Sequence, residues 1–143
     1  MTYNQVIAEI KTLLQSHPMI NSVKYGNPLD WMYQDDQPDF PLAVYAIGTG
    51  SLNVGREITF NITLYFFDKS GREQEFETEV LNDQISILND IISKLRQRKT
   101  KYLIADSVSW SAIQEKHEDY LSGVTTTFEL SVVSDFGACD FPQ

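Results

Sequence analysis

Apolar and polar side chains alternate along two long stretches of this chain, residues 56–67 and 124–133. Alternation with a period of two is typical of strands that bury one face and expose the other, or present it to a partner. The pattern therefore predicts two long strands. Their inward positions are Ile58, Phe60, Ile62, Leu64 and Phe66 in the first, and Val124, Thr126, Phe128, Leu130 and Val132 in the second.

Two other stretches, residues 3–16 and 72–97, repeat their apolar positions at helical spacing. Thr2 and Gln5 fit a capping box at the start of the first helix, and Pro18 ends it. The second helix should place its stripe on the two strands. The stripes are Val6, Ile7, Ile10, Leu13 and Leu14, and then Phe76, Val80, Leu81, Gln84, Leu88, Ile91, Ile92 and Leu95.

Shorter apolar runs complete the order helix, strand, loop, two strands, helix, two strands. They predict strands at 20–25, 42–47 and 102–108, turns at 48–51 and 114–120, and a polar, acidic loop at 29–41. This order predicts an α+β fold: a two-layer sandwich in which two helices pack on one face of a mainly antiparallel, or mixed, sheet of about 4–6 strands. We expect one domain over residues 1–136 and a C-terminal tail over 137–143.

Composition narrows the classes of function. The 143 residues carry a formal net charge of −9, which disfavours nucleic-acid binding through the whole surface. The local basic cluster of residues 96–101 fits a helix C-terminus better than a phosphate site.

Cys139 is the single cysteine and makes no internal disulfide. The start lacks a signal peptide and no apolar run could span a bilayer, so we expect a soluble protein made in a cytoplasm, without membrane contact.

The sequence offers no catalytic signature. His17 and His117 have no partner at ligand spacing, and the acidic loop lacks the spacing of a calcium site. The glycine-rich stretch 48–51 lacks the lysine of a phosphate loop. We therefore predict no catalytic, cofactor-binding or metal-binding residue, no cofactor, and a protein that is not an enzyme.

Large apolar side chains in irregular segments are the candidate site residues. Trp31, Met32 and Tyr33 stand together in the acidic loop, Phe136 stands at the end of the domain, and Phe141 stands in the tail. Such residues indicate contact surfaces with other subunits or partners. They could equally fold back over the core of their own domain, although the terminal position of the tail favours a partner contact.

The order and size of the elements resemble those of a known class of proteins. The features are the N-terminal helix, the strand that ends at Leu64-Tyr65-Phe66-Phe67-Asp68, the long helix around residues 79–85, and the closing strand around 128–132. Together they resemble the tail-terminator and tail-completion (head–tail connector) proteins of tailed bacteriophages, including the ring proteins of crAss-like phage tails. The resemblance covers nearly the whole chain and involves no invariant motif.

The resemblance implies a structural virion protein, assembled in the bacterial cytoplasm and located in the tail or neck. It would form a homo-oligomeric ring of six or twelve copies that joins the portal or connector to the tail. DNA would pass through the channel without specific binding. Contacts between subunits would come from residues 29–41, the hairpin tip at 48–55 and the tail at 137–143. The alternative is a cytosolic α+β adaptor or small enzyme.

Overall fold

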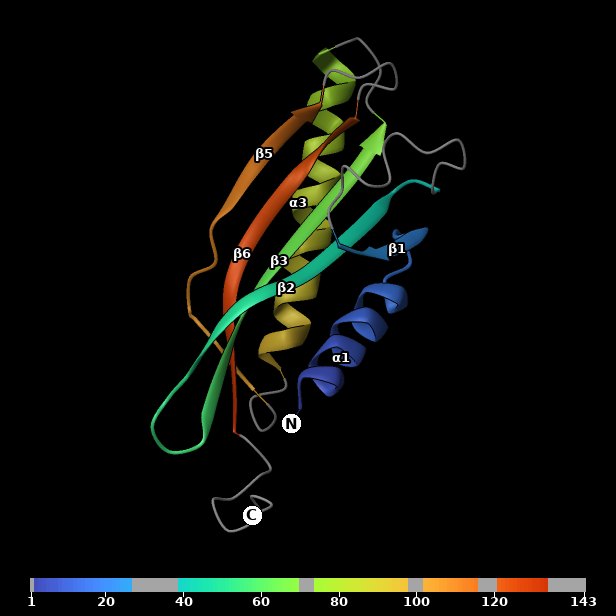
Figure 1. The fold of residues 1–143 in the computed structure, drawn as a ribbon. Helices are drawn as coiled ribbons and strands as arrows, with labels where there is room; N and C mark the ends of the chain where they lie inside the picture. The colour runs from blue at the N-terminus through green and yellow to red at the C-terminus, as the bar shows by residue number, and fades with distance from the viewer. Residues whose placement is uncertain (1, 27–38, 70–73, 98–101, 116–120, 134–143) are drawn as a thin grey trace.

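A computed structural model describes residues 2–26, 39–69, 74–97, 102–115 and 121–133 (Figure 1). The described chain contains two helices and one six-stranded sheet, so the predicted α+β class is confirmed. The helices are α1 (Tyr3–Ser16) and α3 (Gln74–Arg96). The strands are β1 (Ser22–Tyr25), β2 (Leu42–Leu52), β3 (Glu57–Lys69), β4 (Leu103–Ile104), β5 (Trp110–Glu115) and β6 (Leu121–Val133).

The strand order is β1-β2-β3-β6-β4, and β5 also pairs with β6. All pairs are antiparallel except β1 with β2, so the sheet is mixed, as the element order allowed. The central pair, β3 and β6, is in register from Glu57 opposite Val133 to Lys69 opposite Leu121. After β3, α3 crosses the sheet and the chain returns at β4 on the far side of β6.

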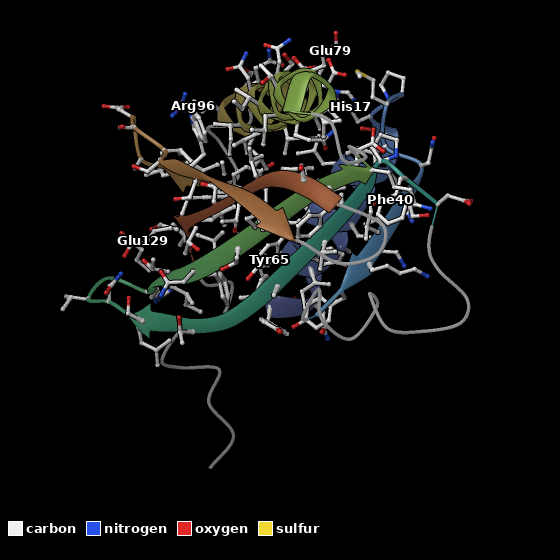
Figure 2. All side chains as sticks on the ribbon, turned by 90° about the horizontal axis from the view of Figure 1, so that it is seen from above. His17, Phe40, Tyr65, Glu79, Arg96 and Glu129 are labelled. Atoms are coloured by element: carbon white, nitrogen blue, oxygen red, sulfur yellow. The ribbon has the colours of Figure 1, made fainter. Side chains whose placement is uncertain are left out.

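Both helices bury their apolar stripes against one face of this sheet. In Figure 2, α3 lies across the strands on one side of the sheet. The predicted core residues Phe60, Ile62 and Leu64 of β3 meet Leu88 and Ile92 of α3 in one cluster. The cluster also includes Val6, Ile10, Leu13 and Leu14 of α1, Phe128 and Leu130 of β6, and the partly buried Leu81. The side chain of Phe76, which we placed in the same core, lies outside the described residues.

The helix boundaries follow the sequence prediction closely. The first helix runs from Tyr3 to Ser16 as predicted, and the capping box of Thr2 and Gln5 is formed. Its two hydrogen bonds join the Thr2 amide to Gln5 Oε1 at 2.8 Å and the Gln5 amide to Thr2 Oγ1 at 3.3 Å. Local capping chemistry therefore sets where α1 begins.

Two predictions about short elements are wrong. Residues 48–51 are not a turn, because β2 continues to Leu52 and the chain reverses only at 53–56. Residues 102–108 are not one strand either. Only Leu103 and Ile104 pair with β6, residues 105–109 leave the ladder, and pairing resumes at Trp110. The edge beside β6 is thus one interrupted strand.

One end of the sheet is buried on both faces. Leu42, Val44 and Phe67 point away from the helices, yet each is at most 3% exposed. Tyr65 stacks on Phe67 with the ring centroids 6.0 Å apart, and Phe40 packs against the same cluster. The outer face is therefore polar only over the other part of the sheet.

A glycine makes the central pairing possible. Gly123 of β6 lies opposite Phe67 and adjacent to Phe66, and a Cβ atom at this position would clash with the backbone carbonyl oxygen of Phe66. Gly48 of β2, in contrast, has no atom within 4 Å of the place where a Cβ would lie. The two glycines form a matched pair, since both belong to strands and neither has a positive φ.

We expect Gly123→Ala to lower the free energy of unfolding by more than about 2 kcal/mol, because neither backbone can yield without breaking the ladder. Gly48→Ala should change it by less than about 0.5 kcal/mol. Urea unfolding of both variants measures the difference. Equal midpoints for the two would contradict the close approach of β6 to β3.

A buried amide side chain stands out within the core. Gln84 of α3 is 1% exposed, and neither of its amide atoms has a hydrogen-bond partner among the described residues. Burial of an unpaired polar group costs free energy, since water would satisfy the same group in the unfolded chain. The helical stripe predicted this position as inward-facing, and the structure places it so.

Gln84→Met should therefore raise the free energy of unfolding by about 1–3 kcal/mol, since methionine keeps the shape and removes the unpaired atoms. Gln84→Glu should lower it, because a charge replaces a neutral amide. Thermal and urea unfolding report both. A fall in stability for the methionine variant would indicate that the amide has partners that stabilise it.

Candidate functional site

The five predicted contact residues, Trp31, Met32, Tyr33, Phe136 and Phe141, all lie outside the described residues. Their roles stay predictions. Of the three segments expected to make subunit contacts, the hairpin tip at 48–55 is described in full, and residues 39–41 of the segment 29–41 are described.

The hairpin of β2 and β3 extends beyond the ends of both helices (Figure 1). At its tip, Leu52 is 84% exposed and Val54 is fully exposed. The turn is nevertheless ordered by Asn53, whose amide donates to the Glu57 carbonyl at 2.8 Å and whose side chain donates to Thr59 Oγ1 at 2.9 Å. The tip therefore presents two aliphatic side chains on a defined turn.

Aromatic side chains fix the root of this hairpin to α1. The Tyr3 hydroxyl donates to the Ile47 carbonyl at 3.4 Å and lies 3.1 Å from the Tyr25 hydroxyl. The hydrogen bond with Tyr25 raises the pKa of the Tyr3 phenol above its ordinary value. Tyr25 also packs edge-on against Tyr45. These contacts cover the outer edge of β2 as far as Ile47.

Beyond Ile47 the outer edge of β2 is open. Residues 48–52 are all exposed, and within the described chain β1 pairs only with Leu42 to Tyr45. The opposite edge of the sheet is open as well, because β5 pairs only with β6 among the described strands. Trp110, Ser111 and Ala112 on that edge are exposed. The sheet thus ends in two unpaired edges on opposite sides.

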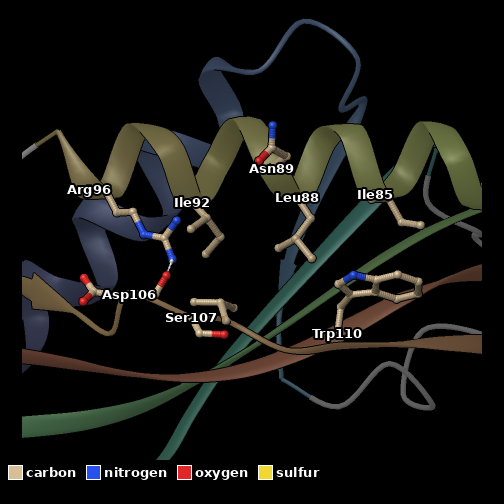
Figure 3. A pocket seen from close by; sticks show the side chains of 9 residues that line it. Ile85, Leu88, Asn89, Ile92, Arg96, Asp106, Ser107 and Trp110 are labelled. Carbon is tan, nitrogen blue, oxygen red and sulfur yellow. Dashed lines mark hydrogen bonds between the residues drawn. The ribbon is translucent and has the colours of Figure 1, made fainter.

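A groove of about 340 Å³ lies between α3 and the interrupted edge strand (Figure 3). Arg96 closes one end, where its Nη2 donates to the carbonyls of Ala105 and Asp106 at 3.2 and 2.8 Å. Trp110, 49% exposed, lies at the other end. The walls between them come from Ile85, Leu88, Asn89, Ile92, Ser107 and Val108. The lining is about equally polar and apolar, and its apolar part, from Ile85, Leu88, Ile92 and Val108, can receive an aliphatic side chain through the open mouth.

The outer face of the sheet near the hairpin is covered by hydroxyl and amide groups. Thr63 and Thr127 lie 3.1 Å apart across the central pair, and Thr59 lies 3.0 Å from Ser131. Asn61 donates to Thr49 at 2.8 Å. Glu57 and Glu129 share this face through their positions in β3 and β6. None of these side chains is basic, so this part of the outer face has no cation for a phosphate backbone, whereas Lys69 lies over the Phe40 ring at the other end of the face.

His17 joins the two helices. Its Nε2 lies 2.9 Å from Asp90 Oδ2, and its Nδ1 accepts from the Met19 amide at 3.1 Å. The Nδ1 atom that accepts carries no proton, so Nε2 donates to Asp90. His17 is also the C-cap of α1.

The part of the chain that the structure describes holds no cluster of metal-binding side chains. No group of three or more histidine, cysteine, aspartate or glutamate residues within it could hold a metal ion. Neither described helix is both long and apolar enough to cross a membrane.

Comparison with known proteins adds no identity. No protein-family model matches the chain, and no curated protein matches it. The surfaces described above are therefore the basis for a functional proposal.

The sequence pointed to the hairpin tip only through the phage resemblance, and it did not indicate Trp110 as a surface residue. The sequence nevertheless contains a signal for the hairpin tip and another for Trp110. Leu52 and Val54 flank Asn53 next to a glycine, so two aliphatic residues stand in a turn. Trp110 stands between two serines, outside any alternating run.

Proposed function

We propose that this chain is a structural subunit of a homo-oligomeric ring in the neck or tail of a tailed bacteriophage. The observation that carries the proposal is the projecting β2–β3 hairpin, whose Leu52 and Val54 are exposed on an ordered turn. Aliphatic residues held in water by a rigid turn are typical of surfaces that contact another chain. The order of the elements, which resembles that of tail-terminator and tail-completion proteins, supplies the context.

The two open edges of the sheet support assembly from identical copies. A ring needs two different surfaces on each subunit, one for each neighbour. The edge at residues 48–52 and the edge at β5 differ in sequence and lie on opposite sides of the sheet. One copy could therefore contact two neighbours at once.

The hydroxyl-bearing outer face suits a surface beside moving DNA. Thr63, Thr127 and Ser131 are neutral, and Glu57 and Glu129 add negative charge. Such a face repels or ignores phosphate groups rather than binding them. In the proposed ring, this face lines the channel and the DNA passes without specific contacts.

Native mass spectrometry and negative-stain electron microscopy of the purified chain test the proposal. We expect a single closed assembly of six or twelve copies with a central opening, and an antibody against the chain should label the neck or tail of phage particles. A monomer or dimer at every concentration, with no labelling of particles, would favour the cytosolic adaptor or small enzyme instead.

A further inference from the structure

We infer that copies of this chain join edge to edge in one specific register. The outer edge of β2 at residues 48–52 pairs with the outer edge of β5 in the next copy, with Leu52 opposite Trp110 of that copy. The inference rests on the proposed function in one respect only: a closed series of these contacts is the ring.

Both edges have the properties of strands that accept a partner. Proteins usually protect exposed edges with charged side chains or proline, because free backbone groups pair with other chains. The short edge strand β1 carries such a charge, Lys24. Residues 48–52 and 110–114 contain no charged residue and no proline. In a chain of net charge −9, these are segments where two copies meet without like-charge repulsion.

The topology gives the direction of the pairing. Within one copy, β2 is antiparallel to β3, β3 to β6, and β6 to β5, so β2 and β5 run in opposite directions. Copies related by rotation about a ring axis keep the same orientation along that axis. The β2 edge of one copy therefore meets the β5 edge of the next as an antiparallel pair, which is the more stable arrangement.

The register follows from which face each side chain occupies. Leu52 pairs with Ile58, and Trp110 pairs with Thr126 opposite Leu64, so both point to the helix side. A register with Leu52 opposite Trp110 keeps the faces matched from Leu52 to Thr49, because side chains alternate with a period of two up to the register shift of β2 at Gly48. Ser51 then lies opposite Ser111 of the next copy on the outer face of the sheet.

The same register brings the hairpin tip to the groove. The turn at 53–56, which follows Leu52, then lies beside residues 105–109 of the next copy, where the edge strand is interrupted. The groove opens on the helix side between α3 and Trp110 in the same region. The interruption thus leaves room for the tip, and Val54, fully exposed in one copy, gains a neighbouring surface in the next.

The geometry is compatible with closure. Across the sheet, Leu52 lies level with Ile58 of β3, and Trp110 lies level with Leu64 of the same strand. Pairing of Leu52 with Trp110 of the next copy therefore displaces that copy by six residues, or about 20 Å, along the strands. The repeat across the sheet, from β2 through β3, β6 and β5 to the next β2, is about 19 Å. These two lengths give a strand tilt of about 45°, close to the range of about 35–45° in closed barrels.

Engineered disulfides test this contact. In a Cys139→Ser background, Ser51→Cys and Ser111→Cys are combined in one chain and exposed to a mild oxidant. Opposed residues of an antiparallel pair have a Cα separation of about 4.5–5.5 Å, which suits a disulfide. We expect a ladder of covalent oligomers that ends at the ring number measured by native mass spectrometry. Mixed single variants should give only dimers, and either single variant alone should give none.

The matched control combines Ser51→Cys with Ala112→Cys, one residue along β5 and on the opposite face, and should not cross-link. Equal cross-linking of both pairs, or of Ser51→Cys with itself, would overturn the register. Rings of normal mass without cross-links would overturn the edge contact and leave the proposed function standing. Covalent chains without a limit in length would support the contact and contradict the ring.

A charge at the contact provides an independent measurement. Leu52→Asp should abolish the assembled species and leave the unfolding temperature of the dissociated subunit unchanged, because Leu52 is 84% exposed within its own copy. Thr12→Asp adds the same charge on an exposed part of α1 and should leave assembly intact. Normal assembly of the Leu52→Asp variant would contradict the inference.

Discussion

The pairing of β3 with β6 is the constraint on which the rest of this structure depends. The two strands are paired along all 13 residues of each. This single register decides which side chains meet α1 and α3 and which form the hydroxyl face. It also leaves one side of β3 for β2 and one side of β6 for β4 and β5. The close approach at Gly123 shows how tightly the pair is set, because there is no space for a Cβ beside the carbonyl of Phe66.

Much of this arrangement could be predicted from the sequence, because long periodic segments carry a repeated signal. The helix from Tyr3 to Ser16 was predicted at both ends, since a capping box and Pro18 mark them. The short elements were harder. A glycine-rich stretch reads as a turn, yet residues 48–52 continue β2, because ladder bonds to β3 stabilise a strand there without any burial. At the break at 105–109, the carbonyls of Ala105 and Asp106 accept hydrogen bonds from the Arg96 side chain at the end of α3, an interaction that the pattern of apolar positions does not indicate.

The buried patch on the outer face shows a different reason for failure. The prediction assigned one face of the 56–67 strand to the core and the other to solvent or a partner. Adjacent Phe66 and Phe67 break that alternation, and both are 1% exposed. Two consecutive buried aromatic residues in a strand require cover on both faces, so the sequence did contain the signal. Leu42 and Val44 pair with Phe67 and Tyr65, so they could be assigned to the patch only once the β2–β3 register was known.

The segments that contribute least to the fold are the ones that the proposed assembly places in contact with other copies. Residues 48–52 and the tip beyond them bury little apolar surface, and β5 exposes Trp110 at the edge of the sheet. A strand kept beyond the helix layer adds no core, so its length is not explained by the stability of the single subunit. The ladder with β3 and the hydrogen bonds of Asn53 nevertheless hold it in a defined conformation. A preorganised edge loses little conformational entropy when a partner pairs with it, because its backbone is already fixed. In the proposed assembly, the extended β2–β3 hairpin therefore serves as a prepared binding surface rather than as part of the core.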